Sequence, residues 1–318
     1  LPNGLITSIP IEITSGNGFT SLEIITIQIG EVSVTDPLGP DAYGYFIYDQ
    51  NDNYELAPTY DWIEIDPNMG GVGEELSQIY DYGDDNDDVA TIDLPFEFTF
   101  YGIDYNQVSI SSNGWISFGE TDMRSFRNYT MPGPGGPPQM VAVFWDDLIT
   151  CLPNGQNSAC QHEGFVVTHY DQPNDRFIIE WSDVLTYYAQ SEESFQIILY
   201  NTGSNTATGD DEMKLQYKEF NNTSTGYYPV GNWNGAPIHG QYCTVGIENH
   251  LSNDGLQYTF NNLYPDAAMP LYDGTALFIT TGNLSLYDDL ILGDINQDQV
   301  IDVLDIVQLV NIILDLSN

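Results

Sequence analysis

The stretch LPFEFTFYGIDYNQVSISSNGWISFG, residues 94–119, decides the fold class of this chain. It covers the end of one candidate strand, Val89–Tyr101, and the whole of a second, Gln107–Phe118. Both strands are rich in aromatic and β-branched residues. Asn113-Gly114 is the strongest hairpin signal in the sequence, because this pair favours the tight turns that join antiparallel strands. The stretch therefore predicts antiparallel β-structure.

Short strands of the same kind continue on both sides, from Asp41 to about Thr281. Turn residues separate the strands, and no helical period interrupts them. This pattern predicts an all-β protein whose body, residues 41–285, is a large β-sandwich. The further candidate strands are Tyr43–Tyr48, Tyr60–Ile65, Met140–Trp145, Gly164–Tyr170, Arg176–Trp181, Ser194–Tyr200, Glu212–Phe220, Gln241–Glu248, Gln257–Phe260 and Thr275–Thr280.

Residues 1–40 form a separate strand segment and a Pro/Gly linker. Isoleucines alternate along the first strand, a turn follows at residues 15–18, and Leu22 to Ile29 form a second apolar run. The apolar face of that run shifts between Ile24 and Ile25, as a β-bulge would require. A third stretch, Glu31–Thr35, leads into the linker. The segment is typical of the last strands of an immunoglobulin-like sandwich, without the earlier strands or a sheet of its own.

The charge balance restricts the possible partners of the chain. Five Lys and Arg stand against 47 Asp and Glu, for a net charge of −42. A field of this sign excludes nucleic acids and anionic membranes as partners, and it suits an ion-rich extracellular setting in which salt screens the self-repulsion. No apolar run is long enough to span a membrane. The start at Leu1, without a signal peptide, predicts a secreted protein in its mature form.

Cysteine usage agrees with an oxidising compartment. Cys151 and Cys160 bracket a loop of turn-forming residues and predict a local disulfide, with two reduced thiols as the alternative. Cys243 alternates with Val245 and Ile247, which favours a buried core thiol over a nucleophile.

A calcium loop is predicted near the C-terminal end, in the segment 286–318. Oxygen side chains occupy positions one, three, five, nine and twelve of a twelve-residue loop, and the carbonyl of position seven is a further ligand. This spacing suits Ca²⁺, the one cofactor that the sequence indicates; the alternative is an acidic cap on a core helix without a metal. The loop ligands are Asp294, Asn296, Asp298, Val300, Asp302 and Asp305.

The helix predicted after this loop, from Val303 to Leu314, has an apolar stripe at helical spacing and apolar residues on a second side. Another surface must therefore cover it. The run GDINQDQVIDVLDIVQLVNIIL resembles one half of a dockerin, a secreted calcium-binding module. Dockerins have two such repeats, whereas this chain has one, and Gln299 replaces the glycine expected at loop position six, which should weaken the site.

Other acidic turns are weaker metal candidates. The loop DYGDDNDD contains Asp84, Asp85, Asp87 and Asp88, whose mutual repulsion a divalent ion would relieve. Two further candidates are the turn with Asp49, Asn51 and Asp52 and the pair Asp146-Asp147. The alternative for all three is a solvated acidic loop.

No catalytic motif is present: none of the four histidines belongs to a serine-, cysteine- or zinc-hydrolase signature, and we expect no enzyme activity. The tryptophans lie mostly in apolar strand runs, which favours core packing. Trp233, in the loop GNWNG, is the best candidate for an exposed platform that stacks on sugar rings.

The body also resembles a known family. The phrases DAYGYFIYD, APTYDWIEIDP, FWDDL, RFIIEWSDV, FQIILY, MKLQYKEFNN and TVGIENH, together with residues 94–119, are similar to the β-rich accessory module of secreted bacterial proteins, including gingipain-like (family C25) peptidases. The resemblance implies a secreted, non-catalytic module. The peptidase domain is absent from this sequence.

Two functions remain open. The first is an extracellular structural subunit that forms a calcium-stabilised fibre or array from copies of itself, by donating strands and a helix. The second is an accessory module of a secreted hydrolase that binds surface glycans or a protein. The alternative to strand donation is that residues 1–35 fold back on their own sandwich and the protein stays a monomer. The predicted assembly residues are Ile9, Ile11, Ile13, Ile25, Ile27, Ile29, Val307, Val310, Ile313 and Leu314.

Overall fold

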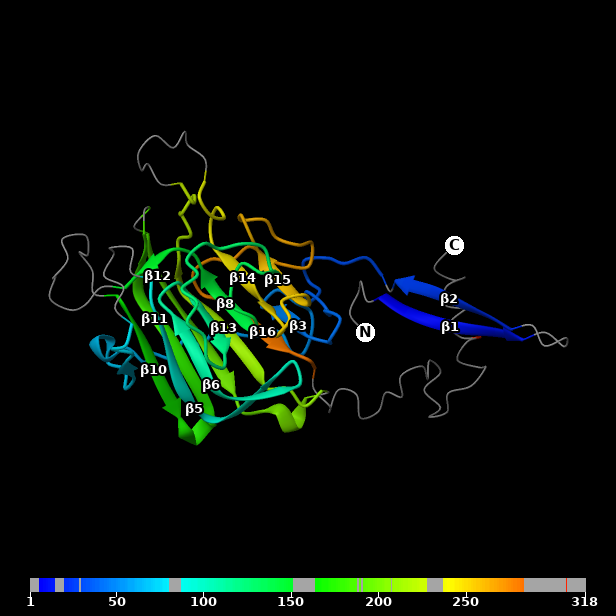
Figure 1. Cartoon of the computed structure of the whole chain (residues 1–318), viewed down its shortest axis with the longest axis horizontal. Helices are drawn as coiled ribbons and strands as arrows, with labels where there is room; N and C mark the ends of the chain where they lie inside the picture. Colours follow the sequence, from blue (N-terminus) through cyan, green and yellow to red (C-terminus); the bar gives the residue numbers. More distant parts are fainter. Residues whose placement is uncertain are drawn as a thin grey trace.

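The computed structural model describes residues 6–14, 20–28, 30–79, 87–150, 164–187, 189, 191–206, 208–227, 237–282 and 307. Their regular secondary structure is almost entirely antiparallel β-strand, and two sheets make a sandwich-like body (Figure 1). The predicted all-β fold class is confirmed. Three short 3-10 turns are the other regular elements of the described body: η1 (Pro67–Met69), η2 (Gln172–Asn174) and η3 (Gly203–Asn205).

The larger sheet has eight strands in the order β3-β16-β13-β12-β11-β10-β4, and β9 pairs with the end of β11. Its elements are β3 (Phe46–Asp49), β4 (Glu74–Glu75), β9 (Leu148–Ile149), β10 (Phe165–Asp171), β11 (Arg176–Thr186), β12 (Glu192–Tyr200), β13 (Glu212–Phe220) and β16 (Thr275–Thr280).

The smaller sheet has six strands in the order β15-β14-β8-β7-β6-β5. Its elements are β5 (Val89–Phe100), β6 (Ile103–Ser111), β7 (Trp115–Phe118), β8 (Met140–Trp145), β14 (Thr244–Glu248) and β15 (Gly255–Thr259). The predicted Asn113-Gly114 turn connects β6 to β7, which pair as an antiparallel hairpin.

Stacked aromatic rings fill the space between the sheets. The ring of Phe195 on β12 lies 5.1 Å from that of Trp181 and 5.2 Å from that of Phe144, so it joins both sheets. All three side chains are fully buried. Aromatic pairs at this separation add attraction to the hydrophobic gain of burial.

The outer face of each sheet is covered as well. On the larger sheet, Ile65 closes a small apolar cluster over Val167 and Ile178. On the smaller sheet, the indole N–H groups of Trp115 and Trp145 both donate to the carbonyl of Ser125, at 2.9 Å each. Irregular segments therefore form a partial outer layer on each of the two sheets.

The strand predictions hold best where the strands are central. The bounds of β8, β13 and β16 agree with the prediction. Tyr60–Ile65 was expected to be a strand, but it pairs with no strand in the described sheets and instead crosses one of them. Glu31–Thr35 is a turn region and not a strand.

The N-terminal strands β1 (Ile6–Thr14) and β2 (Thr20–Gln28) pair only with each other among the described strands. Figure 1 shows this hairpin standing clear of the body. Two expectations were wrong. The strands do form a sheet of their own, and their register runs without a shift, with Ile9 opposite Ile25, so the expected bulge between Ile24 and Ile25 is absent.

The linker after the hairpin is docked on the body. Leu38 and Ile47 exchange two backbone hydrogen bonds of 2.9 Å, and the Tyr54 hydroxyl donates to Asp36 at 2.8 Å. Asn53 N–H donates to the Thr35 carbonyl. Backbone and side-chain hydrogen bonds therefore attach the linker to the body.

Several predicted sites lie outside the described residues: the calcium ligands Asp294, Asn296, Asp298, Val300, Asp302 and Asp305; Cys151 and Cys160; Asp84 and Asp85; Trp233; and Ile29, Val310, Ile313 and Leu314. Val307 is described and is a half-exposed helical residue. The calcium site, the disulfide and the assembly residues therefore stay predictions.

Candidate functional site

An extended segment, residues 61–66, crosses the outer face of the larger sheet; we name it the strap. Three polar side chains in register on neighbouring strands hold it: Gln216 on β13, Gln196 on β12 and Glu180 on β11. Gln216 accepts from the N–H of Asp61 at 2.6 Å and donates to its carbonyl at 2.8 Å.

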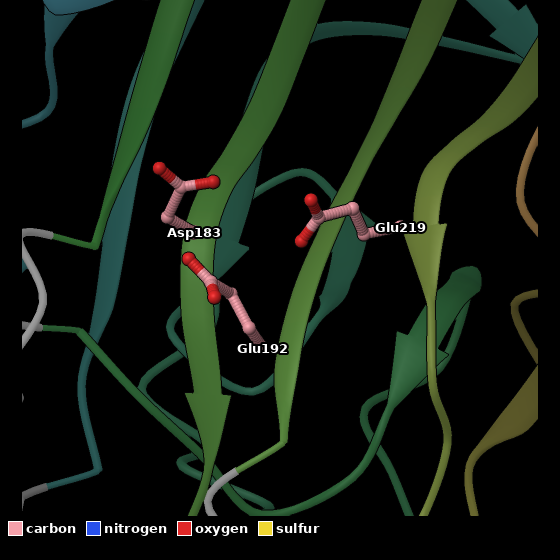
Figure 2. Close-up of side chains that lie close together, drawn as sticks. All are labelled: Asp183, Glu192 and Glu219. Carbon is pink, nitrogen blue, oxygen red and sulfur yellow. The ribbon is translucent and has the colours of Figure 1, made fainter.

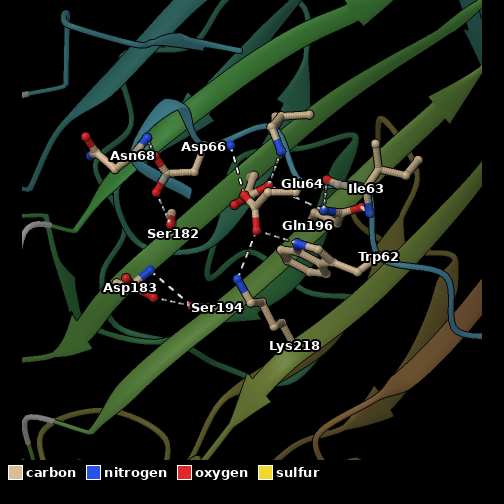
Figure 3. A network of polar contacts seen from close by, with 12 residues as sticks. Trp62, Ile63, Glu64, Asp66, Asn68, Ser182, Asp183, Ser194, Gln196 and Lys218 are labelled. Atoms are coloured by element: carbon tan, nitrogen blue, oxygen red, sulfur yellow. Dashed lines mark hydrogen bonds and ion pairs between the residues drawn. The ribbon is translucent and has the colours of Figure 1, made fainter. Parts of the chain in front are cut away.

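The next two side chains of the row bind the strap backbone in a similar way, each at a residue two positions further along the strap. Gln196 accepts from the N–H of Ile63 at 3.4 Å and donates to its carbonyl at 3.0 Å, and Glu180 accepts from the N–H of Ile65 at 3.4 Å. Figure 3 shows the contacts around Ile63, Glu64 and Gln196. The three side chains therefore bind the strap through its backbone, as a neighbouring strand would.

Glu180 is the exception in this row because its second oxygen, Oε1, is buried without a hydrogen-bond partner among the described residues. Burial raises the pKa of Glu180 to about 9, and the nearby charge of Glu64 adds to the shift. The carboxyl is therefore protonated at neutral pH, which avoids a buried charge.

A small ionic cluster anchors the middle of the strap. The Lys218 ammonium lies 3.0 Å from Glu64 Oε2 and 5.5 Å from the centre of the Trp62 ring, and the indole of Trp62 donates to the same carboxylate at 3.3 Å (Figure 3). Burial is the largest single influence and lowers the pKa of Lys218, but the hydrogen bond and charge of Glu64, together with the charges of Glu180 and Asp183, outweigh it and raise the pKa above its ordinary value. The pair is half-exposed, so its main effect is to orient Trp62.

Two bulges bring acidic side chains together beside the strap. The register shifts between Trp181 and Val184 on β11, and again where β12 pairs with β13 next to Ser194. A bulge lets two consecutive residues face the same side. Asp183, which has a φ of 50°, and Glu219 therefore reach the face where Glu192 also lies (Figure 2).

The oxygens of Asp183, Glu192 and Glu219 lie within 4.8 Å of one another, and all three residues are half-buried. Burial raises the pKa of Glu219, and the charges of Glu192 and Asp183 raise it further. Three carboxylates at this spacing fit a hard divalent cation such as Ca²⁺, with water completing the shell. Without a cation, the cluster destabilises this end of the sheet.

A second polar cluster is buried near the ends of β8 and β14. Asp146 Oδ1 accepts from the N–H of Asp147 at 2.8 Å and lies 3.6 Å from His239 Nδ1, whereas its Oδ2 has no hydrogen-bond partner in the described residues. Burial raises the pKa of Asp146 to about 7 and lowers that of His239 to about 4. Both shifts have the same cause, and they disfavour an ion pair here.

The structure gives ordinary roles to the weaker acidic candidates that it describes. Asp87 accepts from the Asn113 side chain at 2.9 Å, and Asp88 lies 3.2 Å from Arg124. Asp49 accepts from the Tyr258 hydroxyl and the Met269 N–H. Asp52 accepts from the Asp49 N–H through Oδ2. The described part of these turns shows structural hydrogen bonds and no convergent set of three carboxylates.

Neither the acidic cluster nor the row that holds the strap was among the sites predicted from the sequence. Part of the row does leave a signal, because Glu180 and Gln196 are each a single polar residue inside an apolar strand run, whereas Gln216 lies in the alternating run MKLQYK. The cluster leaves none, since its members come from three strands and meet only because two bulges change the register. Cys243, predicted to be a core thiol, is free and buried.

The family model described as NIDO-related matches residues 71–270, which is more than half of the chain. The chain therefore belongs to the NIDO-related family, whose domains occur in extracellular proteins of the adhesion type and are not catalytic. The matched range begins before β5 and ends after β15.

No curated protein and no solved structure matches the chain. The resemblances to the gingipain-type module and to a dockerin half are not part of the family match and stay predictions. Among the described residues, none forms a helix long and apolar enough to cross a membrane.

Proposed function

We propose that this chain is a non-catalytic extracellular structural subunit that joins copies of itself through the β1–β2 hairpin and is stabilised by calcium. One observation carries the proposal: β1 and β2 pair with each other and, among the described strands, with no other strand. A two-stranded sheet is marginally stable alone, and its outer edges are templates for another strand.

The edge strands of the body, by contrast, are protected. One of them, β15, has five residues and shifts register against β14. The edge strand β4 has two residues, both glutamates, and β3 is covered by Leu38. The edge strand β5 contains Pro95 and a register shift between Asp93 and Phe98. Short length, proline, charge and bulges are the usual means of blocking edge pairing. Assembly by strand addition is therefore directed to the hairpin.

Pro10 selects which edge of the hairpin accepts a partner. Proline has no N–H, so the β1–β2 ladder keeps all its bonds only if Pro10 and its partner Ile24 form a non-hydrogen-bonded pair. The outer edge of β1 then lacks a donor at Pro10. Strand β2 has no proline, so its outer edge offers every donor. We assign the joint to β2.

Calcium enters the proposal through the loop at Asp294–Asp305, whose spacing suits the ion. The net charge of −42 opposes contact between copies, and both salt and bound Ca²⁺ reduce that repulsion. The helix predicted after the loop would be a second element that needs a cover, which a neighbouring copy would supply. The role of calcium and of the predicted helix in this proposal is supported by the sequence spacing and the net charge, and not by a contact between described residues.

The test blocks one edge at a time. In the register of the hairpin, Thr26 is opposite Ser8, two residues from the Pro10–Ile24 pair, so the N–H groups of Thr26 and Ser8 face opposite outer edges. Thr26→Pro should abolish filaments in electron micrographs and in light scattering with calcium. Ser8→Pro is the matched control and should leave the filaments intact.

Filaments that persist in Thr26→Pro would show that β2 is not the joint. Loss in Ser8→Pro alone would place the joint on β1 and contradict the assignment. An intact chain that stays monomeric at high concentration with calcium would refute assembly altogether. Both variants retain the hairpin ladder, so their circular dichroism should match that of the parent chain.

A further inference from the structure

An open pocket of about 420 Å³ lies beside the ends of β8, β14 and β15, away from the strap and the acidic cluster. The volume falls within the range of ~300–1,000 Å³ that small-ligand sites occupy. Its lining combines two aromatic rings, two apolar residues and several polar groups. The lining residues are Tyr129, Pro237, Ile238, His239, Gly240, Gln241, Phe260 and Asn261.

Asn128 holds the wall of the pocket in place. This residue is fully buried, and its Nδ2 donates to the carbonyl of Tyr242 at 2.6 Å and to the Thr244 hydroxyl at 3.2 Å. Its Oδ1 lies 2.8 Å from His239 Nδ1, so that nitrogen carries the proton and donates.

Gly240 makes the close packing of this wall possible. Its N–H donates to the carbonyl of Asn128 at 3.0 Å, and a Cβ at this position would lie 2.5 Å from the ring of Phe260 and 2.9 Å from the Asn128 amide. The pocket is therefore preformed. A preformed site loses less conformational entropy when it binds a ligand.

The polar groups at the mouth are not used by the fold. In the part of the chain that the structure describes, the side-chain amide of Gln241, the Nδ2 of Asn261 and the hydroxyl of Tyr129 form no hydrogen bond with the protein; Asn261 Oδ1 accepts from the Gln241 N–H. Tyr129 exposes 44% of its surface. Amides beside aromatic rings suit a sugar, which has polar edges and apolar faces.

Arg127, which directly precedes Asn128 in the sequence and does not itself line the pocket, is the candidate source of positive charge. Its guanidinium lies 5.1 Å from the centre of the Phe126 ring, and the Phe126 ring meets that of His239 edge to face at 6.4 Å. The charge of Arg127 also helps to lower the pKa of His239, after burial. Arg124 and Arg176 each contact a carboxylate, whereas Arg127 has none within 4.0 Å among the described residues.

An arginine that has no ion pair among the described residues is unexpected in a chain where 47 acidic residues compete for five basic ones. The stacking on Phe126 orients the guanidinium and leaves its edge able to bind a carboxylate through two hydrogen bonds. We infer that the Tyr129–His239–Phe260 pocket binds a saccharide that carries a carboxylate, such as a uronic acid unit, with Arg127 pairing to the carboxylate.

The roles of the lining residues follow from this assignment. The rings of Tyr129 and Phe260 contact the apolar face of the sugar, and Gln241 and Asn261 bind its hydroxyl groups. The net negative charge of the protein opposes the ligand at long range, but at physiological salt this repulsion is screened beyond about 8 Å, whereas a direct guanidinium–carboxylate contact is not. Arg127 therefore decides which sugars bind.

The experiment titrates the full chain with a glucuronate-containing disaccharide and with the matching glucose disaccharide, up to about 10 mM, by calorimetry or NMR. The acidic sugar should bind at least about tenfold more tightly, as expected for one charge-assisted contact. Arg127→Gln should remove this preference. Arg124→Gln, whose parent residue is paired with Asp88, is the matched control and should keep it.

Tyr129→Ala should weaken both sugars, because stacking does not depend on charge. Equal binding of the two sugars by the parent chain, or an unchanged preference in Arg127→Gln, would overturn the inference. So would the absence of saturable binding by either sugar. The melting temperatures of the variants should match that of the parent chain, since Arg127 and Tyr129 are exposed.

Discussion

The β1–β2 hairpin has nine-residue strands in unbroken register, whereas the body ends its sheets on strands that are short, bulged, acidic or covered. Both are antiparallel sheets in the same acidic chain. They differ in what lies against them: the body strands pack on a core and on irregular outer segments, and the hairpin strands pair only with each other in the described structure. Stability and edge accessibility are therefore separated in this molecule.

The difference in stability should be the easiest to measure. Trp181→Ala should lower the free energy of unfolding of the body by about 3–5 kcal/mol, because it removes a fully buried ring stacked on Phe195. Deletion of residues 1–28 should leave the thermal unfolding of the body unchanged, since no described body strand pairs with β1 or β2. A large loss of body stability on deletion would show that the hairpin folds back on the sandwich.

The pH dependence should also belong to the body. Burial raises the pKa of Asp52, Asp146 and Glu193 to about 7 and that of Glu180 to about 9. A carboxyl whose folded pKa exceeds its unfolded value of about 4 stabilises the fold fully below pH 4 and loses that contribution as the pH rises to the folded pKa.

The melting temperature should therefore be higher at pH 5 than at pH 8, by an amount that corresponds to several kcal/mol. His239 acts in the opposite direction, because its pKa is lowered to about 4 and its contribution is lost as the pH falls from about 6.5. Asp146→Asn should flatten the curve measured by calorimetry. A curve that rises from pH 5 to pH 8 would contradict the protonated state of these carboxyls.

The strap tests whether irregular cover is as important as the strands. Gln196→Ala removes two hydrogen bonds to Ile63 and leaves buried backbone groups without partners, and we expect a loss of about 1–3 kcal/mol. Denaturant unfolding would measure it. Gln107→Ala, at a side chain that donates to the exposed Asp93 carboxylate at 2.9 Å, is the control and should cost about 0.5 kcal/mol or less.

The smallest effect concerns the acidic cluster. Glu219→Gln removes one of three neighbouring carboxylates, so in chelator it should raise the melting temperature slightly, as relief of repulsion between half-exposed charges of about 0.5 kcal/mol would do. If Ca²⁺ binds there, the stabilisation that calcium gives to the parent chain should shrink in the variant. An equal calcium effect in both proteins would exclude the cluster as a cation site.

The sequence predicts the sandwich well because turn residues bound each central strand and because the apolar face of such a strand can be directed only towards the core. The bounds of β8, β13 and β16 and the turn at Asn113-Gly114 follow from local pattern alone. Tyr60–Ile65 has the same alternation, yet it bonds to side chains and not to a strand. Local pattern gives an extended backbone in both cases and does not distinguish the two partners.

The candidate sites were less predictable because they depend on register. Asp183, Glu192 and Glu219 meet only through bulges, whose positions no turn signal marks. The pocket at Tyr129 and Phe260 joins loops more than 100 residues apart in sequence, held together by the buried Asn128. Motif spacing is suited to predicting sites such as the calcium loop at Asp294, in which all the predicted ligands lie on one short segment.

The row of Gln216, Gln196 and Glu180 binds the strap through main-chain atoms, so it is indifferent to the side chains at Asp61, Ile63 and Ile65. Substitution of the exposed Asp61 should therefore be tolerated in homologous chains, provided that no proline removes its N–H, whereas Ile65 is also constrained by its packing over Val167 and Ile178. The two glutamines have no such latitude, because a shorter or apolar side chain reaches neither the donor nor the acceptor. The sheet residues that hold the strap should therefore vary less among homologous chains than the exposed residues of the strap itself.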